Sequence, residues 1–155
     1  MLLSPLLVTG GPDPDLRAVS QLIVRIGLAN PVVLSPTLAE AKRYLSACAT
    51  SRLPVAILMC VGTGTEEGLD LVAWMREQPD AIATLDTIAL LDPGDETMQM
   101  EAERLALRTV ALPVEMRPLI AALKSLELPE KARIDPATLT VHVELFPRTG
   151  GVSRH

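Results

Sequence analysis

Residues 55–60 read VAILMC and lie just past the first third of a chain of 155 residues. This run is apolar throughout, without alternating polar residues, a pattern typical of a strand buried on both faces of a parallel sheet. A Gly- and Thr-rich stretch at residues 61–67 follows it, and Leu69, Val72 and Met75 then recur at the spacing of one helix face. The run therefore predicts the central strand of an α/β sheet, joined by a loop to a helix.

The same strand-and-helix unit repeats on both sides of this run. Short apolar runs, each followed by helical spacing, occur at residues 6–8, 31–34, 87–91 and 109–112. The first helix is expected to begin at Asp13 and to end at Gly27. The second is expected to open with the capping pair Thr37 and Glu40. Strands alternating with helices predict a three-layer α/β sandwich around a five-stranded parallel sheet with right-handed crossovers.

The character of the chain changes after residue 128. Residues 129–136 are polar and bounded by prolines, whereas residues 138–145 alternate polar and apolar side chains, which predicts a half-buried strand over residues 138–146. Its apolar face would consist of Leu139, Val141, Val143 and Leu145. Such a strand must pair, either with an edge of its own sheet or with a second copy across a two-fold axis. We expect a domain at residues 1–128 and an extension at 129–155, with a loose tail from 147.

Composition excludes several classes of function. The net charge is -5 and the 14 basic residues are scattered, which argues against a nucleic-acid partner. The uncharged run at residues 53–65 is shorter than the roughly 20 residues of a spanning helix, so no membrane segment is expected. Two cysteines are too few for a disulfide scaffold and favour a reducing compartment, the cytoplasm.

Enzyme motifs are missing from the sequence. There is no phosphate-binding G-x-x-x-x-G-K-[ST] loop and no G-x-S-x-G nucleophile elbow. The two histidines, His142 and His155, have no companion cysteine or carboxylate at metal-ligand spacing. We therefore expect no catalysis, no cofactor and no bound metal.

Several segments together resemble the receiver domain of two-component response regulators. They are residues 6–8, 13–15, 27–32, 54–59, 68–69 and 112–114. The resemblance covers residues 1–128 and implies the strand order 2-1-3-4-5. The chain is most similar to single-domain receivers that act with bacterial phytochromes and other histidine kinases.

The resemblance also places uncharged residues where the family carries its chemistry. Thr9 and Gly10 stand in place of the acidic pair, and Cys60 stands in place of the aspartate that accepts the phosphoryl group. Leu91 and Leu112 replace the threonine or serine and the lysine that contact the phosphate. Phosphoryl transfer depends on a nucleophile and on metal ions that neutralise the transferring oxygens. The chain is therefore expected to be a pseudo-receiver that is not phosphorylated.

The sequence offers two other uses for this site. Acidic residues that could rebuild a magnesium site are Asp13, Asp15, Glu66, Glu67 and Asp92. They are better explained as helix caps and first-turn acids favoured by the helix dipole. A small-molecule or thiol redox sensor around Gly10, Cys60 and Leu91 is the alternative function, although a packed, inert Cys60 is favoured.

Interaction surfaces are the remaining candidates. Trp74 is expected on the outer face of its helix, either as a partner contact or lying on its own neighbours. In receivers the fourth helix, fifth strand and fifth helix form the usual dimer or partner face. The corresponding residues here are Met98, Glu101, Arg104, Arg108, Lys124 and Ser125.

The leading hypothesis is a receiver-like adaptor in two-component signalling that binds a histidine kinase, another regulator or its own copy without phosphorylation. A further alternative is that the chain is the receiver-like part of a longer regulator.

Overall fold

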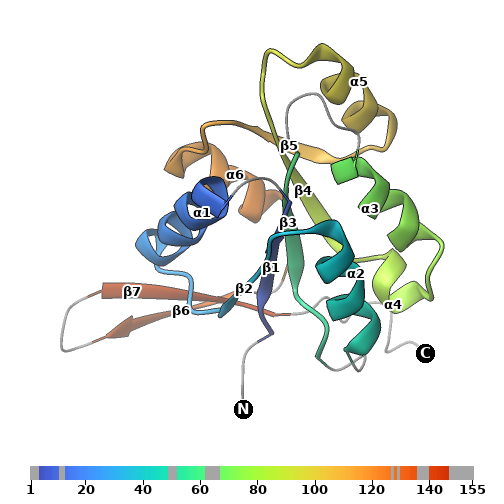
Figure 1. The fold of residues 1–155 in the computed structure, drawn as a ribbon. Helices are drawn as coiled ribbons and strands as arrows, with labels where there is room; N and C mark the ends of the chain where they lie inside the picture. The colour runs from blue at the N-terminus through green and yellow to red at the C-terminus, as the bar shows by residue number, and fades with distance from the viewer. Residues whose placement is uncertain are drawn as a thin grey trace.

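The computed structural model describes residues 4–10, 13–48, 52–61, 67–126, 128, 130–135 and 140–146. A five-stranded sheet in the order β2-β1-β3-β4-β5 forms its centre, and every pair of neighbours in this sheet is parallel (Figure 1). The strands are β1 (Leu6–Thr9), β2 (Val32–Ser35), β3 (Ala56–Cys60), β4 (Asp86–Leu91) and β5 (Arg108–Ala111). The predicted parallel sheet and strand order are confirmed.

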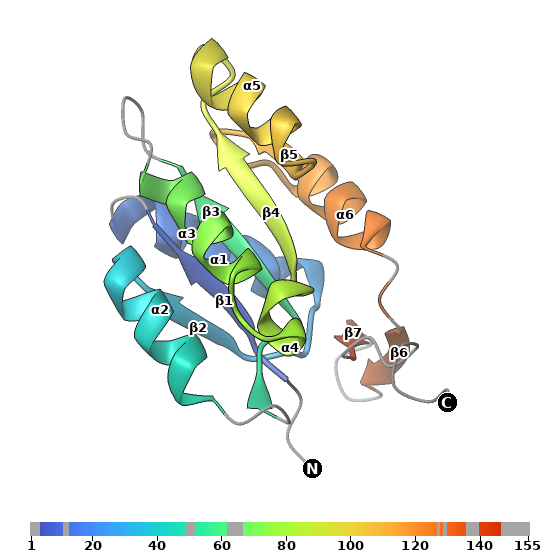
Figure 2. The ribbon, with the colours of Figure 1, turned by 90° about the vertical axis from the view of Figure 1, so that its right-hand side faces the viewer.

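Helices cover both faces of the sheet, as Figures 1 and 2 show. The helices are α1 (Asp13–Ile26), α2 (Leu38–Ala47), α3 (Glu67–Arg76), α4 (Asp80–Ala83), α5 (Glu96–Arg104) and α6 (Met116–Ser125). One hydrophobic cluster joins the sheet to α1 and α6, and a second joins it to α2, α3 and α5. The three-layer sandwich is confirmed, and among the described helices only the four-residue α4 was not expected.

Strand β3 shows why an uninterrupted apolar run is needed at the centre. All five of its residues are buried. Ala56, Leu58 and Cys60 belong to the cluster under α1 and α6, whereas Ile57 and Met59 belong to the cluster under α2, α3 and α5. Both faces of the strand are therefore core.

Local signals in the sequence set the ends of the helices. The Thr37 side chain accepts a hydrogen bond from the backbone N–H of Glu40 at 3.1 Å, as the capping pair predicted. Gly27 follows α1 with a φ of +88°, a conformation that glycine adopts without penalty. Asp95, rather than Asp92, caps α5, because its carboxylate accepts from the N–H of Met98 at 3.1 Å. Asp92 instead accepts from Gly94 N–H at 2.8 Å and shapes the preceding turn.

The C-terminal extension forms a hairpin instead of a lone strand. The predicted strand is present as β7 (Thr140–Leu145), but it pairs antiparallel with β6 (Glu130–Asp135), a segment that we expected to lack a strand. Neither of the partners expected for the strand, the sheet edge or a second copy, is the one observed. The period-two recurrence of Ala132 and Ile134 is the signal for β6, hidden among charged neighbours.

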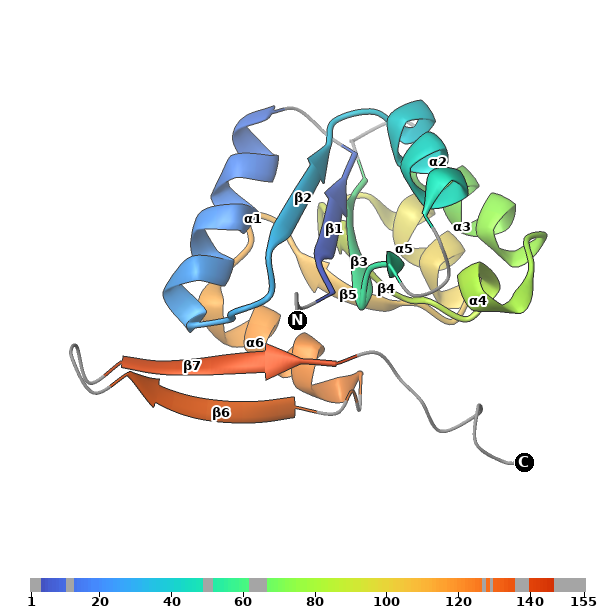
Figure 3. The same ribbon diagram turned by 90° about the horizontal axis from the view of Figure 1, so that it is seen from below.

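This hairpin is fastened to the loop between α1 and β2, below α1 and α6 (Figure 3). Val143 exchanges two backbone hydrogen bonds with that loop, donating to Gly27 O at 2.6 Å and accepting from Ala29 N at 2.7 Å. Leu145 is buried in the same cluster as α1 and α6. The hairpin thus completes the core. No helix within the described ranges is long and apolar enough to cross a membrane.

Candidate functional site

The positions of interest meet at the carboxyl ends of the parallel strands, called here the carboxyl edge: Thr9, Gly10, Cys60, Leu91 and Leu112. Thr9 lies opposite Met59, next to Cys60, and Cys60 lies opposite Leu90. Leu112 donates its N–H to the carbonyl of Leu91 at 2.8 Å. The structure therefore brings the five predicted positions to one edge of the sheet, where ligands of open α/β sheets bind.

Gly10 closes this edge from the side of β1. Its φ is +78°, and a Cβ atom at this position would lie 2.3 Å from the carbonyl oxygen of Cys60. Any larger residue would have to displace the end of β3 and adopt an unfavourable backbone conformation. A carboxylate at position 10 would therefore require a shift of the backbone at this edge.

The other side chains fill the edge. Cys60 is 2% exposed and packs with the α1 and α6 layer, as does the partly buried Leu112. Leu91 is fully buried in the opposite layer. Thr9 is also buried, and within the described ranges its hydroxyl oxygen has no hydrogen-bond partner. The described part of the edge is packed, which weighs against a sensor that uses an emptied pocket.

The acidic residues that were considered as metal ligands lie at the start of α1, at the start of α3 and in the turn before α5. Within the described part of the chain, no three His, Cys, Asp or Glu residues come together as metal ligands would. Asp13 and Asp15 lie in the first turn of α1, and Glu67 begins α3. Glu66 lies outside the described residues. Asp92 is engaged in the turn before α5.

Comparison with known proteins identifies the fold. The bacteriophytochrome response regulator RtBRR superposes with a TM-score of 0.73 at 22% identity, over 87% of this chain and 84% of its own. The bacteriophytochrome response regulator AtBRR gives 0.68 at 22% identity, over 81% and 94%. A response regulator receiver protein from Pseudomonas putida gives 0.65 at 19% identity, over 81% and 98%.

The chain has the receiver-domain fold. No family model and no curated protein matches its sequence. The receiver fold is thus established by the arrangement of the backbone at low sequence identity.

Within this receiver fold, Trp74 is less exposed than expected. It packs against the core cluster beneath α2 and α3, and the Lys42 ammonium lies 6.0 Å from the centre of its ring. The cation–π contact links α2 to α3. Trp74 therefore lies on its own neighbours, the second of the two expectations for it.

The face formed by α5, β5 and α6 keeps only part of its predicted residues. Met98 is 4% exposed and belongs to the core, so its placement on a partner surface was wrong. Arg104 is exposed and forms an ion pair with Glu101. The Arg104 guanidinium also donates hydrogen bonds to the Glu101 carboxylate, and these are the main reason that the pKa of Glu101 is lowered. Arg108 donates to the carbonyl of Ser125 at 2.9 Å, which ties β5 to α6.

The predicted apolar face of the C-terminal strand is used within the chain. Leu145 is buried and Val143 is partly buried in the α1 and α6 cluster, so neither is an exposed contact residue. Leu139 lies outside the described residues, and Val141 lies in β7 opposite Ile134.

Two pockets lie away from the carboxyl edge. One is a groove of about 190 Å³ between α3 and α5, with Ala73 and Glu101 among its lining. The other, of about 140 Å³, opens at the amino ends of β4 and β5. None of the five carboxyl-edge residues lines either pocket.

Proposed function

We propose that this protein is an atypical response regulator, a pseudo-receiver of two-component signalling that acts in the cytoplasm through protein–protein contacts without aspartyl phosphorylation or catalysis. The observation that carries the proposal is the packing of Gly10 against the carbonyl of Cys60. A receiver fold whose carboxyl edge is packed and uncharged keeps the backbone architecture of the family without its phosphorylation site.

The chemistry of phosphoryl transfer supports this proposal. The reaction needs an accessible nucleophile and cations that neutralise charge on the transferring oxygens. Cys60 is buried, Leu91 and Leu112 carry no charge, and Gly10 leaves no room for a carboxylate. A conventional receiver changes its surface when it is phosphorylated, whereas this one would present a single surface to its partner.

The exposed helical faces are the proposed contact surfaces. The face of α5, β5 and α6 carries Arg104 and the 69% exposed Met100. An exposed large apolar residue beside charged neighbours fits a partner contact, with a histidine kinase, another regulator or a second copy. Since β7 pairs within the chain, a homodimer is proposed through this face and not through the C-terminal strand.

Phosphorylation itself is the test. The protein is incubated with acetyl phosphate and magnesium, and its intact mass is recorded beside that of a conventional receiver treated in the same tube. We expect the mass of the conventional receiver to rise by one phosphoryl group and that of this chain to remain unchanged. Stoichiometric phosphorylation of this chain would overturn the proposal.

A further inference from the structure

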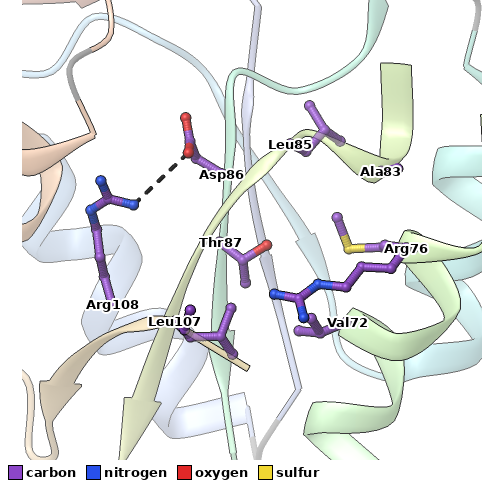
Figure 4. A pocket seen from close by; sticks show the side chains of 10 residues that line it. Val72, Arg76, Ala83, Leu85, Asp86, Thr87, Leu107 and Arg108 are labelled. Carbon is purple, nitrogen blue, oxygen red and sulfur yellow. Dashed lines mark ion pairs between the residues drawn. The ribbon is translucent and has the colours of Figure 1, made fainter. Parts of the chain in front are cut away.

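The pocket at the amino ends of β4 and β5 combines apolar side chains with four polar ones, of which Asp86 and Arg108 face each other (Figure 4). Val72 and Met75 from α3, Leu85 before β4 and Leu107 before β5 form the wall. Arg76 and Thr87 are the other two polar residues, and Figure 4 shows the Arg76 guanidinium directed toward the Thr87 hydroxyl. Pockets of this composition are typical of small-molecule sites.

Arg76 has no carboxylate partner in the described part of the chain. Across the described ranges, no carboxylate oxygen lies within 4.0 Å of its guanidinium nitrogens. One of its N–H groups donates to the carbonyl of Leu105, and a guanidinium has five such donors. Arg108 differs, because it faces Asp86 at 4.0 Å and also donates to Ser125. Arg76 is therefore the group in the pocket with donors and charge to offer a ligand.

The size and wall of the pocket limit the ligand. A volume of about 140 Å³ is close to that of a cavity that holds a ligand of roughly six non-hydrogen atoms, such as benzene. A guanidinium beside a hydroxyl matches the two oxygens of a carboxylate. The apolar residues around them match a short hydrocarbon chain and disfavour a strongly hydrated anion such as phosphate.

We propose that this pocket binds a small aliphatic carboxylate, with its oxygens on Arg76 and Thr87 and its chain against Val72, Leu85 and Leu107. The site lies at the amino ends of the strands, opposite the carboxyl edge. It does not depend on the proposed signalling role.

Butyrate is a suitable probe, with butanol as its uncharged counterpart and inorganic phosphate as the alternative anion. Amide chemical shifts of the full chain are followed by two-dimensional NMR during each titration. We expect saturable shifts at Thr87 and Leu107 with butyrate, and much weaker or unsaturable shifts with butanol and phosphate. Phosphate that binds at least as tightly as butyrate would overturn the proposal, as would equal binding of butanol.

Matched variants locate the site. Arg76→Gln should weaken butyrate binding roughly tenfold or more, since hydrogen bonds to charged groups contribute on that scale. Arg117→Gln, which removes an exposed arginine on α6, should leave binding unchanged. Ala83→Leu narrows the pocket without altering its charge and should abolish binding, whereas Ala121→Leu on the exposed side of α6 should not. Unchanged affinity in Arg76→Gln, in a variant that keeps the native NMR spectrum, contradicts the site.

Discussion

Single residues determine which side chains fit at the carboxyl edge, and Gly10 imposes the tightest constraint. Two strands approach so closely there that the β1 end contacts the Cys60 carbonyl with no space for a side chain. The absence of a side chain at position 10 is therefore coupled to backbone geometry. A side chain placed there would strain the backbone and displace the end of β3.

Gly10→Ala should lower the free energy of unfolding by about 2–4 kcal/mol. The left-handed conformation costs an alanine about 1–2 kcal/mol, and the displaced Cys60 carbonyl adds steric strain. Urea denaturation followed by circular dichroism measures the change. Gly94→Ala is the control, because its Cβ would meet only the Asp92 carboxylate at 3.4 Å. That variant should differ from the parent by about 0.5 kcal/mol or less. Equal stability of the two variants would contradict the close approach at Gly10.

Tyr44 offers a second measurement at this scale, since it is the one tyrosine in the sequence. Burial raises its pKa above the ordinary value of 10.0, and the neighbouring Cys48 raises it further. Absorbance of the phenolate during alkaline titration should therefore rise at a higher pH in the folded protein than after unfolding in urea.

The same shift predicts how stability depends on pH. The unfolded chain loses the Tyr44 proton first as the pH rises through 10.0, so the stability of the fold falls from there upward. Cys48→Ala should lower the folded pKa but keep it above 10.0, because burial is the larger cause. A midpoint that does not move in this variant would show that Cys48 has no influence on Tyr44.

At the scale of elements, the side chain of Asn30 connects three segments of the chain. Its amide nitrogen donates to the carbonyls of Ser4 and Leu145, each at 2.7 Å. Its amide oxygen accepts from the N–H of Leu145, also at 2.7 Å. Asn30 is 3% exposed, so these bonds are made away from water. The residue positions β7 beside the start of β1 and β2.

Asn30→Ala should destabilise the protein by about 2–4 kcal/mol, because it leaves two carbonyls and one N–H without their partner. Thermal and urea unfolding give the size of the effect, and amide hydrogen exchange of Val143 and Leu145 should accelerate more than that of β3. Gln21→Ala removes an exposed side-chain amide from α1 and should have little effect. Uniform acceleration of exchange in all strands would argue against a local role for Asn30.

The elements show which predictions a sequence supports. The runs at residues 6–8 and 55–60 predicted buried parallel strands, because burial on both faces requires uninterrupted apolar residues. The capping pair Thr37 and Glu40 predicted the start of α2, because its hydrogen bond is local. Met98 was misplaced even though its spacing to Ala102 and Leu105 is that of one inward helix face. The helical period alone thus indicates that Met98 is buried.

Contacts between distant segments were beyond such reasoning. The hydrogen bond from Asn30 to the Leu145 carbonyl joins residues 115 positions apart, and no local sequence pattern predicts it. The contact between Lys42 and Trp74 depends on how α2 lies against α3. At the candidate site, the five positions followed from the resemblance, whereas the close approach of Gly10 to Cys60 required the structure.

At the scale of the whole molecule, the two most exposed large apolar side chains of the described residues lie on different helices. Met100 on α5 is 69% exposed and Val24 on α1 is 71% exposed. If a second copy binds through the face of α5, β5 and α6, Met100→Asp should convert a dimer to a monomer. Light scattering after size exclusion measures the mass, and Val24→Asp is the control on the other face. A parent protein with the mass of one chain, or a dimer retained in Met100→Asp, would contradict this arrangement.

The bonds of Asn30 have a further consequence for how the chain can be extended. One amide holds both Ser4 and Leu145, so the described body starts and finishes at the same corner. Sequence added before the first strand or after the last would emerge there, at the amino ends of the strands. Because one side chain holds Ser4 and Leu145, the two ends of the described body are near enough to be linked in a circularly permuted gene.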